Sequence, residues 1–96
     1  MSAFIIANVD VTDPEGFAAY RDMVAPTVAA ASGRYRVRGG ATEILEGSFV
    51  PRRLVILEFE SMQAARDWYH SDAYAPALAL RKRSAVSDVT LVEGID

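Results

Sequence analysis

The sequence predicts an α+β fold, a four-stranded antiparallel sheet whose helices lie on one face. Three observations indicate this class. Apolar runs typical of strands and amphipathic runs typical of helices follow one another in the order strand, helix, strand, strand, helix, strand. The chain has 96 residues with no linker or low-complexity tract, so we expect a single domain over residues 1–96. Residues with capping side chains precede the helical runs, which places their starts.

The first element is a strand over residues 3–9. This run is apolar and rich in branched side chains, and only the amide of Asn8 interrupts it. Successive side chains of a strand point to opposite faces of the sheet. One face therefore carries Phe4, Ile6 and Asn8, and the other carries Ile5, Ala7 and Val9.

The second element is a helix that begins near Pro14 and stops at Ser32-Gly33. Thr12-Asp13 supplies a side-chain cap, and a proline suits the first helical turn. Apolar residues recur at spacings of three and four, which puts Phe17, Tyr20, Val24, Val28 and Ala31 on one face. Pro26 has no N–H and its ring clashes with the preceding turn, so we expect a kink or a break into two shorter helices there.

The third element is a short strand over residues 34–38, in which the side chains alternate. Tyr35 and Val37 share one face, and Arg34, Arg36 and Arg38 share the other. Gly39-Gly40 then makes a bulge or a bend. An extended stretch over residues 42–46 follows, before a turn over residues 47–51.

The last three elements are a strand, a helical region and a strand. The strand over residues 53–60 is apolar on both faces at residues 54–57. Ser61 caps a helix that carries Ala65, Trp68 and Tyr69. Ser71-Asp72 restarts a helix through Tyr74, Leu78 and Arg81, with Pro76 in its first turn. A final strand covers residues 86–93.

This order is that of a ferredoxin-like βαββαβ sandwich, in which the first and third strands are central. Both of these strands are apolar on both faces, whereas a sheet with one covered face shows polar alternation. We therefore expect material outside the chain to cover the second face. We expect a homodimer in which two sheets pack face to face around a two-fold axis and close into an α+β barrel. The alternative is that short strands expose these apolar side chains incidentally.

Short motifs cover nearly the whole chain in a fixed order. They are Tyr20, Val24-Ala25-Pro26-Thr27, Gly33-Arg34-Tyr35, Val37-Arg38-Gly39-Gly40, Leu45-Glu46-Gly47, Pro51-Arg52-Arg53, Leu57-Glu58-Phe59, Trp68-Tyr69, Ser71, Tyr74, Arg81 and Val92-Glu93-Gly94. Together they resemble the domain of unknown function 1330 family. The resemblance implies a dimeric α+β barrel, in a superfamily that also holds cofactor-free monooxygenases and muconolactone isomerases, and it implies no particular reaction. Ser32 and Arg36 depart from the family pattern, which has a glycine and an aliphatic residue there.

The composition excludes several classes of partner. A formal net charge of -3 argues against general nucleic-acid binding, which gathers positive charge. No run approaches the roughly 20 apolar residues that cross a membrane, and no basic leader precedes the first strand, so we expect a soluble, cytoplasmic protein. With no cysteine, one histidine and no nucleotide-binding motif, we expect neither a metal site nor a cofactor.

His70 is a candidate catalytic base because it is the one side chain that ordinarily titrates near neutral pH. Asp67 lies one helical turn earlier and can orient the imidazole ring. Ser71 is adjacent in the chain and does not face it, so no Ser/His/Asp triad is expected. The alternative is a solvated histidine at a helix C-terminus, where a positive charge suits the helix dipole.

The Arg38-Gly39-Gly40 segment is a candidate binding element. Paired glycines let a ligand approach the backbone beside a guanidinium, an arrangement that suits a carboxylate or a phenolate. The alternative is an edge strand protected by its arginines, with glycines that only bend it. Glu46 is a second candidate base, and it can pair with Arg38 or Arg53 across the hairpin or form a simple salt bridge there.

Asn8 and four aromatic residues are candidates for a pocket. A buried amide needs partners, and a polar group among aromatic walls is typical of small-molecule sites. The walls are Tyr20, Trp68, Tyr69 and Tyr74. The alternatives are ordinary core packing for the aromatic residues and backbone hydrogen bonds for the amide. The basic run Arg81-Lys82-Arg83 at a helix end is expected to remain solvated.

These features favour a homodimer that binds a small anionic or aromatic metabolite in a pocket between sheet and helices. Catalysis would then be cofactor-free proton abstraction, isomerisation or monooxygenase-like chemistry, with His70 or Glu46 as the base and Arg38 stabilising negative charge. The alternatives are a non-catalytic ligand sensor and a structural partner protein without a ligand. Fold alone does not decide between them.

Overall fold

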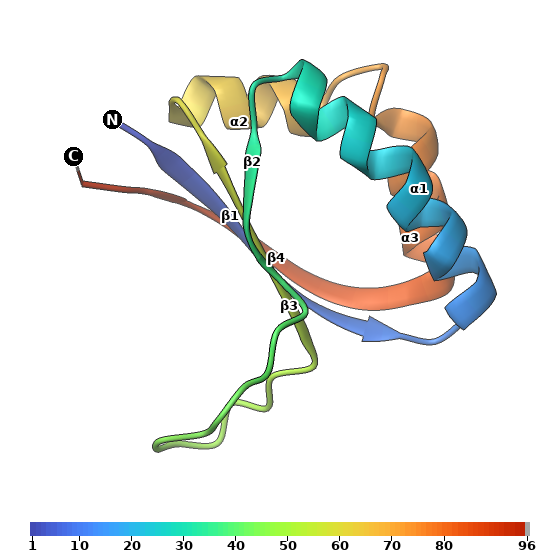
Figure 1. The fold of residues 1–96 in the computed structure, drawn as a ribbon, viewed down its shortest axis with the longest axis vertical. Coiled ribbons are helices and arrows are strands. Elements are labelled where there is room, and N and C mark those ends of the chain that lie inside the picture. Colours follow the sequence, from blue (N-terminus) through green and yellow to red (C-terminus); the bar gives the residue numbers. More distant parts are fainter. Residues whose placement is uncertain (96) are drawn as a thin grey trace.

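The computed structural model describes residues 1–95 and has the predicted order of elements (Figure 1). The elements are β1 (Ala3–Val11), α1 (Pro14–Ala30), β2 (Arg34–Arg38), β3 (Arg53–Phe59), α2 (Met62–Tyr69), α3 (Ala75–Ser84) and β4 (Ala85–Glu93). The four strands form one antiparallel sheet in the order β2-β3-β1-β4. The predicted α+β, ferredoxin-like topology is thus confirmed, with the first and third strands at the centre.

Helix α1 begins at Pro14 as expected, but two details of the sequence prediction were wrong. The helix runs without a break through Pro26 to Ala30, so it is not divided into two. The side chain of Asp13 forms no capping hydrogen bond. Instead, the backbone N–H groups of Thr12 and Asp13 donate to the Ser84 carbonyl oxygen at 2.9 and 3.0 Å, which ties the start of α1 to the end of α3.

The predicted stop of α1 and the Ser61 cap of α2 are present, whereas α3 begins at Ala75, later than expected, and Tyr74 at its start forms no side-chain cap hydrogen bond. Ser32 adopts a left-handed φ of 59°, and the Gly33 N–H donates to the Val28 carbonyl oxygen at 2.9 Å. The Ser61 hydroxyl accepts from the Ala64 N–H at 3.0 Å and starts α2. The Ser71 hydroxyl accepts from the Tyr74 N–H at 3.1 Å in the turn that leads into α3.

Strand β2 contains a bulge that the sequence prediction missed. The pairing register shifts between Tyr35 and Val37, so the extra residue is Arg36. Because the side chains of a strand alternate, one extra residue moves everything after it to the opposite face. Val37 therefore pairs with Ile56, and Arg38 pairs with Val55. The prediction that Tyr35 and Val37 share a face was wrong: Tyr35 and Arg38 share the helix-covered face.

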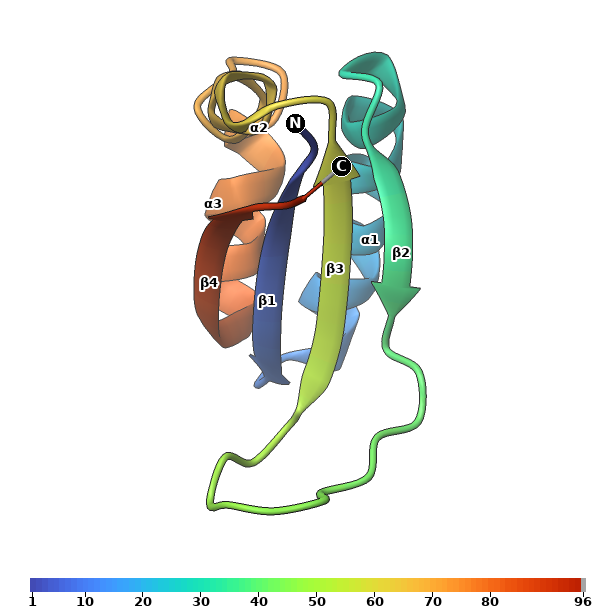
Figure 2. The ribbon, with the colours of Figure 1, turned by 90° about the vertical axis from the view of Figure 1, so that its left-hand side faces the viewer.

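The segment between β2 and β3 is a projecting loop rather than a further strand. Gly39 makes the expected bend with a φ of 67°, and its N–H donates to the Leu54 carbonyl oxygen at 2.7 Å. The stretch over residues 42–46, expected to be extended, forms no strand. Figure 2 shows the loop reaching well beyond the end of the sheet.

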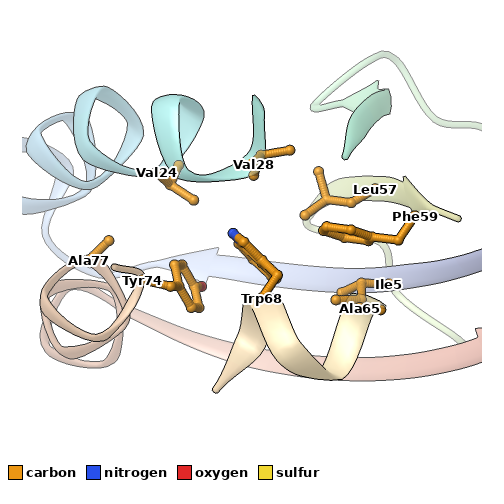
Figure 3. Close-up of a cluster of buried hydrophobic side chains, with 9 residues drawn as sticks. All are labelled: Ile5, Val24, Val28, Leu57, Phe59, Ala65, Trp68, Tyr74 and Ala77. Atoms are coloured by element: carbon orange, nitrogen blue, oxygen red, sulfur yellow. The ribbon is translucent and has the colours of Figure 1, made fainter. Parts of the chain in front are cut away.

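The helix-covered face of the sheet holds the core. Its main cluster consists of Ile5, Val24, Val28, Leu57, Phe59, Ala65, Trp68, Tyr74 and Ala77 (Figure 3). The Trp68 ring stacks on Tyr74 at 4.1 Å between centroids, and its Nε1 donates to the Thr27 hydroxyl at 3.1 Å. Trp68 therefore links α2 to α1 and to the start of α3 in the middle of the molecule.

We use the name open face for the opposite surface of the sheet, which no helix covers (Figure 2). Register and alternation place these side chains on it: Phe4, Ile6, Asn8, Asp10, Arg34, Val37, Leu54, Ile56, Glu58, Val86, Asp88, Thr90 and Val92. Ile6 is 37% exposed and Val92 is 43% exposed. Within the described residues, no helix is long and apolar enough to span a bilayer.

Candidate functional site

A hollow of about 480 Å³ lies between α1 and the β2–β3 edge of the sheet, on the helix-covered face. We call it the arginine cleft. Its lining consists of Phe17, Arg21, Asp22, Ala25, Pro26, Tyr35, Arg38, Arg53 and Val55. Three guanidinium groups thus face a single carboxylate, and the volume falls in the range of about 300 to 1,000 Å³ typical of small-molecule sites.

The bulge in β2 brings Arg38 into this cleft. Its guanidinium carbon lies 3.8 Å from the centroid of the Tyr35 ring, close enough for a cation–π interaction. The pKa of Tyr35 is raised by burial, although Arg38 and Arg53 act in the opposite direction. The tyrosine is therefore a neutral hydroxyl that can donate a hydrogen bond in the cleft. The predicted binding residue Arg38 is placed at a cavity between sheet and helices.

Gly39 makes room for the second arginine of the cleft. A side-chain carbon on Gly39 would collide with Nη1 of Arg53, and the φ of 67° also favours glycine. Arg53 lies over the Phe17 ring at 5.7 Å, and its buried Nε has no hydrogen-bond partner among the described residues. Gly40 has open space around it, so the structure gives the two predicted glycines different environments.

A second, smaller hollow lies deeper between the sheet and the helices. We call it the tyrosine chamber, and its volume is about 40 Å³. Its lining consists of Ile5, Ala7, Val9, Tyr20, Val55, Leu57, Trp68, Tyr69, Tyr74, Arg81 and Val89. All four predicted aromatic residues, Tyr20, Trp68, Tyr69 and Tyr74, are thus brought together. The hydroxyl oxygens of Tyr20 and Tyr74 are 3.1 Å apart and form a hydrogen bond.

Arg81 lines the tyrosine chamber, and the prediction that it is solvated was wrong. Only 6% of Arg81 is exposed. The spacing offers a signal that sequence reasoning did not use, because Tyr74, Ala77, Arg81 and Ser84 follow at intervals of three and four and are all buried. Lys82 and Arg83, which lie off this face, are exposed as expected.

The lining of the chamber includes one positively charged side chain, Arg81, and no carboxylate. Burial acts to lower the pKa of Arg81, but interactions with Tyr74, including a hydrogen bond, and with Tyr20 give a net upward direction. Burial raises the pKa of Tyr20 far above its ordinary value, and Tyr74 adds to this effect. The chamber therefore contains the Arg81 cation and the neutral Tyr20 hydroxyl.

His70 lies on another side of the molecule, at the end of α2. It borders a hollow of about 240 Å³ between α2 and β4, which shares Ile5, Tyr69 and Val89 with the tyrosine chamber. The side chain is exposed, and its ring meets Tyr69 edge-on at 5.3 Å. The expected partner Asp67 instead accepts a hydrogen bond from Gln63 Nε2 at 2.7 Å.

Glu46 and Asn8 are separated from the arginine cleft. Glu46 is exposed on the projecting loop and forms no ion pair with Arg38 or Arg53. Asn8 lies on the open face, where its Nδ2 donates to the Val50 carbonyl oxygen at 3.2 Å and its Oδ1 accepts from the Arg52 N–H at 2.7 Å. The structure therefore does not bring the amide together with the aromatic residues. Instead, Asn8 fastens the base of the loop to the sheet.

The described residues contain no group of three or more His, Cys, Asp or Glu side chains that could hold a metal ion. The polar groups available for chemistry are instead guanidinium and hydroxyl groups. These can bind and stabilise negative charge on oxygen, because they are hydrogen-bond donors with positive or partial positive charge.

Comparison with known proteins gives a family and a fold. The family described as Domain of unknown function (DUF1330) matches residues 2–95. No curated protein matches the chain. A crystal structure of RPA0582, a protein of unknown function from Rhodopseudomonas palustris, is similar with a TM-score of 0.79 and 18% identity, covering 99% of this chain and 83% of that one.

Two further solved structures share the fold at lower similarity. SnoaB, a cofactor-independent oxygenase from Streptomyces nogalater, has a TM-score of 0.59 and 14% identity, covering 99% of this chain and 94% of that one. Rv0793 from Mycobacterium tuberculosis has a TM-score of 0.58 and 17% identity, covering 100% of this chain and 97% of that one. At these identities, the likeness establishes the fold alone.

Proposed function

Because this chain belongs to the DUF1330 family, which carries no assigned reaction, we propose a function from its own site: it binds a small metabolite with an anionic group and an aromatic or flat apolar part. The observation that carries this proposal is the arginine cleft. Three guanidinium groups and two aromatic rings line it, against one carboxylate. A guanidinium can bind a carboxylate through two parallel hydrogen bonds, and the rings supply apolar contact area.

The geometry favours Arg38 and Arg53 as the groups that hold the anion. Arg38 lies against the Tyr35 ring and Arg53 against the Phe17 ring, and these contacts restrict the conformations of the two side chains. Neither forms an ion pair within the described part of the chain. The Nε of Arg53 is buried without an acceptor, and a ligand oxygen would supply one.

Isothermal titration calorimetry with benzoate tests this proposal, with neutral benzamide as the matched ligand. We expect benzoate to bind, and Arg38→Ala to weaken it by about tenfold or more because a charged hydrogen bond is lost. Arg83→Ala removes the same charge from an exposed position and is the control, with affinity kept within about twofold. No binding of benzoate, equal binding of benzamide, or equal losses in the two variants would overturn the proposal.

Cofactor-free catalysis on the bound ligand is a second candidate. The guanidinium and hydroxyl groups of the two hollows can stabilise the negative charge that forms on oxygen when a proton leaves a neighbouring carbon. The fold is shared with SnoaB, a cofactor-independent oxygenase. His70 and Glu46 remain the predicted bases, although neither lines the arginine cleft. Turnover of a ligand that survives both His70→Gln and Glu46→Gln would remove them from this role.

We also propose that a second copy of this chain covers the open face. Ile6 and Ile56 pair at the centre of this face, and Ile6 is 37% exposed. Apolar side chains lie at the centre of this face, and a two-fold axis through the centre would bury the same residues on both copies. The exposed apolar side chains Ile44 and Phe49 on the projecting loop extend the surface available for this contact.

A further inference from the structure

Arg81 is a buried cation without a counter-charge. It is 6% exposed, and it forms no ion pair with a carboxylate in the part of the chain that the structure describes. Its polar neighbours are Tyr74, Tyr20 and Tyr69. Burial raises the pKa of Tyr20, so this hydroxyl, which is hydrogen-bonded to that of Tyr74, supplies a dipole rather than a negative charge.

A buried charge without a counter-charge is costly, even where it is hydrogen-bonded. Removing an ion from water carries a penalty of several kcal/mol, and apolar residues of similar volume often serve stability as well or better. The rest of the chamber is apolar or aromatic, so a methionine at position 81 would match its surroundings. A ligand that carries a negative charge would explain why a cation occupies this position.

The size of the chamber limits what enters. A volume of about 40 Å³ exceeds the roughly 10 to 15 Å³ that one water needs, and it suits the few atoms of a carboxylate rather than a ring. The chamber and the arginine cleft share Val55 as a lining residue. Phe17 of the cleft also contacts Tyr20 of the chamber, with ring centroids 5.4 Å apart.

We propose that Arg81 and the Tyr20–Tyr74 hydroxyl pair form an inner subsite for a second acidic group of the ligand. This inference rests on the proposed binding in the arginine cleft. The ligand body lies between α1 and the β2–β3 edge, with one acidic group at Arg38 and Arg53. Its other end reaches Arg81, where the hydroxyl groups and the guanidinium are hydrogen-bond donors to the incoming oxygen. The preferred substrate class is thus a compact diacid.

Binding measurements separate the inner subsite from the outer one. The probes are benzoate, which carries one acidic group, and isophthalate and terephthalate, which carry two at different spacings. We expect one of the diacids to bind at least tenfold more tightly than benzoate. In Arg81→Met this advantage disappears while benzoate affinity stays within twofold, and Arg81→Lys keeps part of it. A diacid advantage that persists in Arg81→Met overturns the inference.

The two proposals fail in different ways. If benzoate binds and depends on Arg38, but neither diacid gains over it, the inner subsite is wrong and the proposed function stands. If none of the three probes binds, both are wrong.

Thermal unfolding without ligand adds an independent readout. If Arg81 is retained for a ligand, Arg81→Met leaves the unfolding midpoint unchanged or raises it, and Tyr74→Phe, which keeps the ring stacked on Trp68, still folds. If Arg81 is a structural residue, Arg81→Met lowers the midpoint while Arg81→Lys lowers it less. That second result overturns the inference.

Discussion

The two faces of the sheet differ in which kind of side chain is unusually placed. One face buries a charged side chain, and the other exposes apolar side chains. The helix-covered face, which should be apolar, encloses Arg81 and the Tyr20–Tyr74 hydroxyl pair. The open face, which should be polar in a chain standing alone, carries Ile6 and Ile56 at its centre. Both arrangements cost free energy in the isolated chain. In the proposals above, a ligand supplies negative charge to the first face and a second copy of the chain covers the second.

The two faces have different proposed partners. A cation with aromatic neighbours fits a small acid, whereas a broad apolar sheet fits another protein surface. We group the projecting loop with the open face, because Asn8 fastens the base of the loop there and Phe49 on the loop is 60% exposed. A substitution that abolishes the proposed binding at one face should therefore leave the proposed binding at the other face unchanged.

The largest effect is expected from a charge at the centre of the open face. Ile6→Lys places two buried ammonium groups near the two-fold axis of the proposed dimer, so the dimer should dissociate at micromolar concentration. Light scattering coupled to size-exclusion chromatography measures the mass. Met23→Lys is the matched control because Met23 is 40% exposed on α1, against 37% for Ile6. Equal masses for the two variants would contradict the assignment of the open face.

A smaller effect is expected from Gly39→Ala on the helix-covered face. The new carbon meets Nη1 of Arg53, and the left-handed φ of 67° adds strain, so the free energy of unfolding should fall by about 1 to 2 kcal/mol. Benzoate affinity should fall with it, because Arg53 is displaced. Urea unfolding and calorimetry check both quantities.

Gly40→Ala is the control for that substitution. Gly40 has nothing within 4 Å of the added carbon, so stability and affinity should remain close to those of the wild type. If the two alanine variants behave alike, Gly39 does not position Arg53.

The smallest effect is expected at the end of α1. Ser32 has a φ of 59°, a conformation that costs a residue with a side chain about 1 kcal/mol relative to glycine. Ser32→Gly should therefore raise the free energy of unfolding by up to about 1 kcal/mol, as measured by urea unfolding. It touches neither hollow, so benzoate affinity should be unchanged, and a destabilised Ser32→Gly would contradict the account of this helix end.

Local signals were sufficient for most of the fold. The Ser61 cap, the proline at the start of α1 and the alternation in β1 each depend on neighbours within a few residues, and the structure contains all three. The break expected at Pro26 did not occur. Val24 and Val28, on either side of Pro26, both pack in the core, and this packing outweighs the hydrogen bond that the proline lacks.

The candidate site was only partly predictable because it depends on long-range register. The four aromatic residues were identified from composition and do meet in one chamber. The bulge at Arg36, which brings Arg38 into the arginine cleft, has no glycine or proline to mark it. Arg81 was missed because a charged residue at a helix end is usually solvated. Asn8 was grouped with the aromatic residues, although the strand alternation placed it on the opposite face.

The claim that a small acid binds on the helix-covered face and not on the open face is tested most directly by an NMR titration. The wild-type protein is titrated with benzoate, and the chemical shifts of the backbone amides are followed. The account predicts chemical-shift changes concentrated at Tyr35, Arg38 and Arg53 around the arginine cleft. The amides of Phe4, Thr90 and Val92 around the open face should not move. Shifts concentrated on the open face, with the arginine cleft unchanged, would contradict the account.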